Sequence, residues 1–489
     1  MSRRKGIIVV LLLFIGSVLL RLPNINRPLS RHHEFNTAVI LVNIESWRQS
    51  GGGSRYHYIP LLNYQHPGDK CPPISAQVDP SGNVLYVSFG PGWYVIPYFI
   101  YQVFDLPAEA KYLQVINLFF HLAAVVMLFL LCEVLFPQDK RYESVVLTCC
   151  LFIFSPGVLW YLGNGYVLTG IEMPFVLAAL LVLIPMLRSP AEINPRRLGK
   201  LGVLIIVLVY IDWFVLFLSF VTFIRLVFSV RKDGRYIPLL FVIGAASLAG
   251  VALLFLQFAS YVGFEKLFLS LKYHFFVRSI TGARSSFFSQ LTMVMQHIAS
   301  SYLPVVFLLA GVLGIMLRRK LKGGLTEREV IFLAIYASAV VLYNLFLLQW
   351  SAVHEFALIP LSVLLVVITA RLTMRVVNNT GGFYAVMSSY IFIACVQYYL
   401  INRPGEVSVA GTRYDCYERF GRQLQNIPLD HKLFMDTTWN AAIDHYAHRN
   451  FTVVRNIDSA RAFVQRWGVS KAVWIGQRDY KLEKIVALP

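Results

Sequence analysis

Long apolar runs recur along most of the 489-residue chain, and many have the length that crosses a bilayer. A transmembrane helix needs about 20 consecutive, predominantly apolar residues. Only 14% of the residues are charged and 57% are hydrophobic, whereas soluble domains carry about 25% charged residues. We therefore expect a mainly α, polytopic membrane protein, which excludes an ordinary soluble enzyme, a secreted disulfide scaffold and a disordered chain. The runs predict about eleven spans, at residues 6–20, 111–136, 145–160, 171–188, 201–211, 213–230, 237–256, 302–317, 329–349, 356–371 and 381–401.

The first run resembles a signal peptide, because Arg3, Arg4 and Lys5 precede it. No small-residue cleavage site follows it, and the chain continues with Arg21-Leu22-Pro23 instead. We interpret the run as an uncleaved helix whose amino end lies in the cytoplasm. The polar stretch at about 21–110 is then a large external loop, and loops of this length are usually functional.

Basic residues give the chain a formal net charge of +18, and they collect in alternate connections between the apolar runs. The short turns that contain no Lys or Arg are 161–170, 211–213 and 349–355. This asymmetry follows the positive-inside rule and predicts a cytoplasmic amino terminus and an external carboxyl terminus. No recognition helix, zinc finger or aromatic RNA-binding strand accompanies the charge, so we expect no nucleic acid partner.

Several segments do not fit a simple span. Trp93–Phe104 contains Pro97 and is too short to cross, so it predicts an interfacial or re-entrant helix. The runs at 201–211 and 213–230 form either two short spans or one longer element. After residue 403 strands and helices alternate, which predicts a small external α/β domain at 404–489 beside a transmembrane domain at 1–403. The expected elements of the small domain are strands at 433–436, 451–455 and 471–475 and helices at 440–449 and 459–467.

The first loop contains the cluster Arg31-His32-His33-Glu34. Glu34 is a candidate general base, and the two histidines are candidates for metal binding or proton transfer. The alternative is a solvated turn ahead of a loop helix. Further along the loop, Asp69 either lines the same cavity or lies in a solvated turn.

A second polar site lies at the predicted external turn that contains His354 and Glu355. An ionisable pair where a span meets water is costly to leave unpaired, which favours a functional role. The alternative is an interfacial anchor in which Trp350 belongs to the aromatic belt.

The external segment from Gln257 to Ser301 combines aromatic residues with basic ones, among them Lys272, Arg278 and Arg284. Such groups suit the phosphate head of a lipid. The alternative is snorkelling of the long side chains at the membrane surface. Four of the six cysteines fall in predicted spans, which leaves Cys71 and Cys416 as one candidate disulfide.

The order of these features resembles the GT-C superfamily of membrane glycosyltransferases, which includes the protein O-mannosyltransferases and the aminoarabinose transferases that modify lipid A. Members have a cytoplasmic amino terminus, one helix, and then a large external loop with an acidic residue near its start, the place that Glu34 takes here. An external α/β tail also fits. The resemblance extends over nearly the whole chain and rests on layout and on the segments Arg31–Glu34, Tyr86–Trp93, Ser155–Gly157, Gly163–Tyr166 and His354–Pro360.

The resemblance implies transfer of a sugar from a polyprenyl-phosphate donor to a lipid, glycan or protein acceptor, on the periplasmic face of a bacterial inner membrane. Glu34 is implied as the base that deprotonates the acceptor hydroxyl for inverting attack, with His33 beside it. The residues implied to bind the donor phosphate are Lys272, Arg278 and Arg284. The residues implied to position substrates are His32, His354, Glu355 and Asp69.

One departure from the family concerns a metal. Many relatives have two adjacent acidic residues in the first loop, whereas this chain has His33-Glu34. The metal requirement therefore stays open, with a divalent cation as a candidate cofactor. The alternative function is a transporter or flippase for a lipid-linked glycan precursor. Transporters typically carry charges near mid-membrane and show paired repeats, neither of which is visible in this sequence.

Overall fold

A computed structural model describes residues 1–25, 27–29, 33–72, 75, 77–136, 141–279, 286–321, 324–377, 379–401, 415–478 and 480–488. The chain divides into two compact units. Unit 1 comprises Met1–Pro23, Val115–Leu254 and His274–Arg403, and unit 2 comprises Asn24–Gln114, Phe255–Tyr273 and Pro404–Pro489. Each unit is thus assembled from segments that lie far apart in the sequence.

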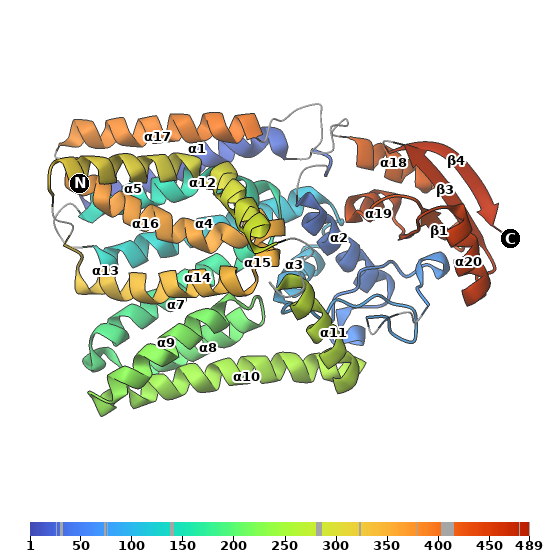
Figure 1. Cartoon of the computed structure of the whole chain (residues 1–489), viewed down its shortest axis with the longest axis horizontal. Helices are drawn as coiled ribbons and strands as arrows, with labels where there is room; N and C mark the ends of the chain where they lie inside the picture. Colours follow the sequence, from blue (N-terminus) through green and yellow to red (C-terminus); the bar gives the residue numbers. More distant parts are fainter. Residues whose placement is uncertain are drawn as a thin grey trace. The chain divides into compact units, whose positions relative to one another are not determined.

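Unit 1 is helical throughout the part that the structure describes. Its long helices run roughly parallel to one another (Figure 1). The chain passes from one unit to the other within α4, α10 and α11. These helices and those of unit 1 are α1 (Arg3–Arg21), α4 (Ala110–Leu135), α5 (Arg141–Phe154), α6 (Pro156–Leu159), α7 (Leu168–Arg188), α8 (Pro195–Val209), α9 (Phe214–Val230), α10 (Ile237–Val262), α11 (Phe264–Arg278), α12 (Phe287–Arg318), α13 (Glu327–Phe332), α14 (Ser338–Phe346), α15 (Leu348–Val353), α16 (Ile359–Val376) and α17 (Thr380–Ile401).

Eight of the described helices are long and apolar enough to cross a membrane. A ninth span is counted if the bent pair formed by α5 and Pro156–Asn164, which meet at 61°, is one span. The polytopic helical architecture is confirmed, but the count of eleven spans is not. Helices α8 and α9 have 15 and 17 residues. They do not fuse, because a turn separates them in which Asp212 accepts a hydrogen bond from the backbone N of Trp213 at 2.6 Å.

Helix α12 begins fifteen residues before the predicted start of its span, at Phe287 instead of residue 302. Ser286 caps it by accepting a hydrogen bond from the backbone N of Ser289 at 3.2 Å. The polar residues of this stretch led the sequence analysis to expect an external segment, but nothing between the cap and Pro304 breaks a helix. Helix α12 therefore carries polar side chains on its first turns and apolar ones beyond.

Helix α5 is the centre of unit 1. Every residue from Ser144 to Phe154 is buried, since α1, α16 and α17 all pack against it. This packing fixes α16, and thereby the short 3-10 helix η9 (Glu355–Leu358) that leads into α16. The predicted second polar site is thus attached to the most buried part of the unit.

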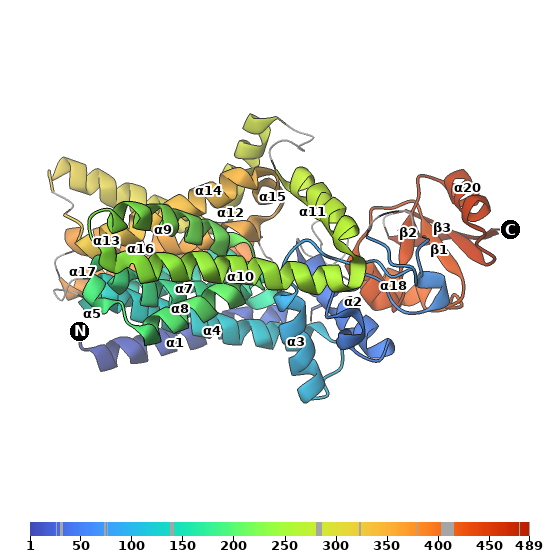
Figure 2. The ribbon, with the colours of Figure 1, turned by 90° about the horizontal axis from the view of Figure 1, so that it is seen from below.

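Unit 2 contains a four-stranded sheet in the order β2-β1-β3-β4. Strand β1 runs parallel to β2 and β3, and β4 is antiparallel to β3. Helix α20 packs against the sheet around Phe434, Ala460 and Val464 (Figure 2). The elements of unit 2 are α2 (Glu34–Gln49), η2 (Gly53–Tyr56), η3 (Pro67–Asp69), α3 (Gly92–Val103), α18 (Cys416–Leu424), β1 (Lys432–Met435), α19 (Ala441–Ala447), β2 (Phe451–Val453), α20 (Ile457–Trp467), β3 (Ala472–Arg478) and β4 (Lys481–Leu488).

The sheet confirms the small α/β element that the sequence predicts near the carboxyl terminus, with each expected strand and helix present. Two elements were not expected. Helix α18 is a short amphipathic helix, and β4 is a largely exposed edge strand that begins with charged residues, so neither has a strong apolar signal. The predicted short helix near Trp93 is also found, as the 12-residue α3.

Candidate functional site

Glu34, the predicted base, is the first residue of α2 and is buried in unit 2. Its Oε1 accepts a hydrogen bond from the guanidinium of Arg27 at 2.5 Å, and the side chains of Arg27 and Glu34 are only 7% and 3% exposed. The amino end of a helix also attracts negative charge through the helix dipole. A cation and a helix end therefore hold this carboxylate in one place. Arg27 was not singled out from the sequence, where only its closeness along the chain hints at a partnership.

The residue before α2 has an unusual backbone. His33 adopts the left-handed conformation, with φ 65°, and is buried. Non-glycine residues in this region are uncommon, and they cluster at functional sites. The predicted catalytic role of His33 beside Glu34 stays a prediction. His32 lies outside the described residues.

The segment before α2 is attached to the carboxyl-terminal part of unit 2. The backbone N of Leu29 donates to the hydroxyl of Tyr446 at 2.8 Å. Tyr446 belongs to α19, and α19 packs along α2. The start of the first loop is therefore positioned by residues more than four hundred positions later in the chain, since 417 positions separate the two bonded residues.

Asp69 is completely buried, and it joins the first loop to the strand–helix segment near the carboxyl terminus. Its Oδ1 accepts a hydrogen bond from the backbone N of Asn450 at 2.9 Å, and the side-chain amide of Asn450 donates to Oδ2 of Asp444 at 2.9 Å. Burial raises the pKa of Asp69 to about 6 and that of Asp444 to about 8. These contacts give Asp69 a structural role, and its predicted part in positioning substrate stays a prediction.

The candidate disulfide is absent from the structure, which describes all six cysteines. The Sγ of Cys71 instead lies 3.8 Å from Nζ of Lys432.

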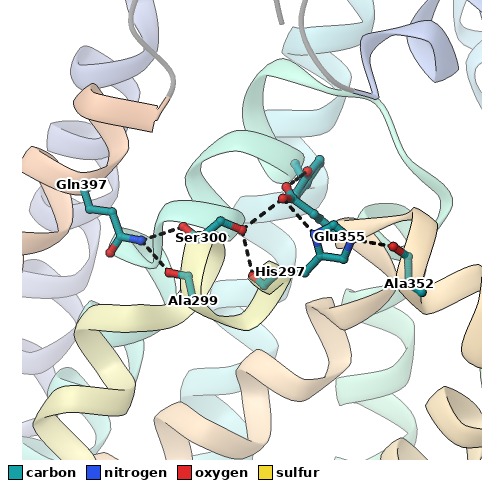
Figure 3. A network of polar contacts seen from close by, with 7 residues as sticks. His297, Ala299, Ser300, Ala352, Glu355 and Gln397 are labelled. Carbon is teal, nitrogen blue, oxygen red and sulfur yellow. Dashed lines mark hydrogen bonds and ion pairs between the residues drawn. The ribbon is translucent and has the colours of Figure 1, made fainter. Parts of the chain in front are cut away.

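Glu355 is the centre of a polar network in unit 1 (Figure 3). Its Oε2 accepts a hydrogen bond from the hydroxyl of Tyr161 at 2.5 Å. Its Oε1 accepts one from the hydroxyl of Ser300 at 3.0 Å and lies 3.1 Å from Nδ1 of His297. The side chains of His297 and Glu355 are 16% and 21% exposed, so the pair is shielded without being sealed from solvent.

The geometry of His297 locates a proton. Its Nε2 lies 2.8 Å from the carbonyl oxygen of Ala352, which only accepts, so Nε2 carries a hydrogen. Its Nδ1 faces a carboxylate oxygen, and two lone pairs would repel each other there. A proton therefore lies between Nδ1 and Oε1, whichever of the two groups carries it. His297 was missed in the sequence, although a His and a Ser three residues apart in an apolar helix are a usable signal.

An aromatic cluster adjoins this network. The ring of His354 lies 3.9 Å from that of Trp350 and 5.0 Å from that of Phe356, measured between centroids. The guanidinium carbon of Arg278 lies 4.9 Å from the Trp350 ring, which is a cation–π contact. The structure thus brings together three of the predicted residues of unit 1, namely Arg278, His354 and Glu355.

Of the other two predicted phosphate ligands, the structure describes only Lys272. Lys272 is exposed on α11, in the part of that helix that belongs to unit 2. Arg284 lies outside the described residues. Within the described ranges, no group of three or more His, Cys, Asp or Glu side chains is arranged to hold a metal ion.

Comparison with known proteins shows a relationship in structure only. No protein family model matches the chain, and no curated protein matches it in sequence. ArnT from Cupriavidus metallidurans, solved with bound undecaprenyl phosphate, aligns with a TM-score of 0.64 at 10% identity, over 99% of this chain and 97% of ArnT. The archaeal oligosaccharyltransferase AglB from Archaeoglobus fulgidus, solved with an inhibitory peptide and a dolichol-phosphate, aligns with a TM-score of 0.56 at 14% identity, over 97% of this chain and 70% of AglB.

The alignments cover nearly all of this chain, including the helices of unit 1 and the discontinuous unit 2. At 10–14% identity they establish the fold and not the activity. The fold that the layout of the sequence predicts is therefore confirmed as one that this chain shares with ArnT and AglB.

Proposed function

We propose that the protein transfers a sugar from a polyprenyl-phosphate-linked donor to an acceptor hydroxyl, with inversion at the anomeric carbon. The reaction takes place on the external face of a bacterial inner membrane, with the amino terminus in the cytoplasm and the carboxyl terminus outside. The observation that carries the proposal is the buried pair of Glu34 and Arg27 at the start of α2, on the fold that ArnT and AglB also have.

Glu34 is the base in this scheme. Its carboxylate takes the proton of the acceptor hydroxyl, and the oxygen attacks the anomeric carbon. The bond between that carbon and the phosphate oxygen breaks, and the polyprenyl phosphate leaves with the bonding electrons. Arg27 and the end of α2 hold the carboxylate in place, which matters because a small error in the position of a catalytic group costs up to about a hundredfold in rate. His33 assists Glu34 from the adjacent position.

Cations stabilise the leaving phosphate, whose negative charge grows as the bond breaks. Arginine suits this role, because its planar fork binds phosphate oxygens in pairs. We assign the phosphate to Arg278, Arg284 and Lys272. Stacking on Trp350 orients the guanidinium of Arg278. The residues assigned to positioning donor and acceptor are His32, His354, Glu355 and Asp69.

Two further observations support a lipid-linked donor. The ligands of the similar proteins are undecaprenyl phosphate for ArnT and a dolichol-phosphate for AglB. In unit 1 an apolar groove lies between α12 and α17, where a hydrocarbon chain of such a donor is more stable than in water. The residues that line this groove are Pro304, Phe307, Leu308, Ala385, Val386, Ser389, Tyr390 and Ile393.

The test is release and transfer of sugar from a panel of radiolabelled polyprenyl-phosphate sugars by the purified protein in detergent, with an envelope extract as the source of acceptor. The wild type and Glu34→Gln are compared, each with and without a chelator. We expect Glu34→Gln to lose transfer at least about a hundredfold, the scale of a lost general base. The chelator arm determines whether a divalent cation takes part.

The matched control is Glu418→Gln. Glu418 also pairs with an arginine of unit 2, Arg422 at 2.7 Å, but on the solvent side of the amphipathic helix α18, where the Arg422 side chain is 67% exposed. We expect this variant to transfer sugar at the wild-type rate. Normal turnover in Glu34→Gln would remove Glu34 as the base. No turnover by folded wild type across the panel, together with transbilayer movement of a lipid-linked glycan in vesicles, would establish the flippase instead.

A further inference from the structure

Pro304 interrupts the backbone hydrogen bonds of α12, which runs unbroken from Phe287 to Arg318. Proline has no backbone N–H, so it leaves without a donor the carbonyl four residues earlier, which here belongs to Ser300. Ser300 is half-buried. A carbonyl that is partly shielded from water is costly to leave without a donor, and native structures find a replacement in most cases.

The replacement comes from another helix. The side-chain amide Nε2 of Gln397, on α17, donates to the carbonyl oxygen of Ser300 at 2.7 Å and to that of Ala299 at 2.9 Å (Figure 3). An amide nitrogen has two hydrogens, so it serves both carbonyls at once. Gln397 therefore completes the hydrogen bonding of α12 at the point where Pro304 breaks it.

Ser300 also contacts the Glu355 network through its side chain. Its hydroxyl donates to Oε1 of Glu355 at 3.0 Å, and it lies 3.0 Å from the carbonyl oxygen of His297, one turn earlier. The backbone of Ser300 is thus fixed by Gln397, and its hydroxyl is fixed on the same oxygen that faces Nδ1 of His297.

We propose that Gln397 is a positioning residue that acts through Ser300 on the pair formed by Glu355 and His297. This inference rests on the proposed function, in which Glu355 positions substrate. Loss of the Gln397 amide leaves the Ser300 carbonyl to be hydrated or to shift toward another donor. Either change moves the Ser300 hydroxyl away from Glu355, and the carboxylate then loses this hydrogen bond.

A movement of the Ser300 hydroxyl would affect the titratable groups around Glu355. The titratable groups that interact with it from neighbouring elements include His297 and Tyr302 of α12 and Tyr161 of the π-helical segment η4 (Trp160–Asn164). Among them His297 shares its proton with Glu355, so the position of Ser300 affects how readily this proton leaves. Gln397 variants should therefore change the pH profile of sugar transfer as well as its rate.

The first experiment compares Gln397→Ala and Gln397→Glu in sugar transfer over a range of pH. The glutamate variant keeps the shape of the side chain but replaces its donors by acceptors. We expect both variants to lower kcat at least about tenfold, since misplacing a positioned group costs up to about a hundredfold. KM for the donor should stay within about twofold, because a positioning defect that leaves ground-state binding intact appears in kcat. At low pH, where the new carboxyl is protonated and donates again, Gln397→Glu should recover relative to Gln397→Ala.

The second experiment needs no activity. Pro304→Ala returns a backbone N–H to α12, which can then donate to the Ser300 carbonyl. Gln397→Ala should lower the Tm in detergent by several degrees in the wild-type background and by less than half as much in the Pro304→Ala background. Such a double-mutant cycle isolates the contact between the two positions. The matched control is Ser388→Ala, an exposed polar position on α17, with an equal and small effect in both backgrounds.

The outcomes are distinct. If Gln397→Ala lowers the Tm equally in the wild-type and Pro304→Ala backgrounds, the inference is overturned, whether or not any sugar is transferred. A wild-type kcat and pH profile in Gln397→Ala also overturns it. If the folded wild type transfers no sugar while the cycle shows the expected coupling, the proposed function fails and the contact between Gln397 and the Pro304 break stands.

Discussion

Gly163 lies directly against Arg21. A β-carbon built on Gly163 would be 2.5 Å from Cδ of Arg21 and 2.8 Å from one of its terminal nitrogens. Arg21 is almost completely buried at the end of α1, where its guanidinium bonds the carbonyl oxygens of Ser17 and Leu162 and Nδ1 of His121. A glycine is therefore required at this position of η4, because a buried arginine occupies the space that a side chain would need.

We predict that Gly163→Ala destabilises unit 1. The added methyl group cannot fit without displacing Arg21 from its hydrogen bonds, and overpacking of this kind costs about 1–3 kcal/mol. Thermal unfolding in detergent measures the effect as a lower Tm. Gly165→Ala is the control two residues away, because the nearest atom to its added carbon is 3.7 Å distant, an ordinary contact. Equal Tm values for the two variants would show that Arg21 does not fill this space.

We predict that the ion pair of Arg27 and Glu34 contributes more to stability than the exposed pairs of unit 2. Arg27→Gln leaves a buried carboxylate without its cation, which costs about 3–5 kcal/mol. Removing one partner of an exposed pair costs about 0–1 kcal/mol, so Arg422→Gln on α18 is the control. Chemical unfolding in detergent should separate the two variants. The same Arg27→Gln protein should transfer sugar poorly at a temperature where it is still folded, and wild-type transfer there would contradict the role of Arg27 in holding Glu34.

We predict that the stability of unit 2 falls as the pH rises from about 4 to about 8. Burial raises the pKa of Asp444 from its usual 3.8 to about 8 and that of Asp69 to about 6. At these two carboxyls the folded state binds more protons than the unfolded state in this window. Burial lowers the pKa of His445 to about 3, which offsets the effect of one carboxyl below about pH 6.5. The free energy of unfolding therefore still decreases as the pH increases through the window. The Tm measured across this range should show the decline.

The control for this pH dependence is a pair of asparagine variants. Asp444→Asn cannot ionise, so it should flatten most of the decline in Tm. Asp430→Asn should leave the decline intact, because Lys471 and His431 hold the pKa of the exposed Asp430 carboxyl at about 2. An unchanged slope in Asp444→Asn would mean that this carboxyl ionises as easily in the folded chain as in the unfolded one.

The sequence predicts the helical architecture because apolar length is a local property. Each run of unit 1 contains its own signal, as does the alternation around β1, α19 and β2. The start of α12 was misplaced for a related reason, since polar residues such as Gln290 and His297 lowered the apolar signal although they do not break a helix. The count of eleven spans is not confirmed, because the run that contains Phe154 bends after that residue and α8 and α9 have only 15 and 17 residues.

A single sequence does not reveal which residues contact the candidate site residues in the folded protein. Glu355 and His297 are 58 positions apart, and Glu355 and Tyr161 are 194 apart. Nothing local links them, because they meet only when α12, η4 and η9 are packed together. Glu34 could be proposed as the base from its place near the start of the first loop. The hydrogen bonds that surround Asp69, in contrast, depend on a segment near the other end of the chain.

Unit 2 is assembled from segments near both ends of the chain, and this has a consequence for its biosynthesis. Its first segment ends at Gln114 and its last begins at Pro404, and the bond between Tyr64 and Asn450 joins residues 386 positions apart. A ribosome that adds about 5–20 residues per second needs on the order of 15–60 s to make the roughly three hundred residues in between. During that interval the first loop has no Asn450, Tyr446 or α19 to pack against. Unit 2 can fold completely only after the end of the chain has been made. A ribosome that stalls late in the message therefore leaves a chain that has the helices of unit 1 but in which the segment around Glu34 lacks its packing partners.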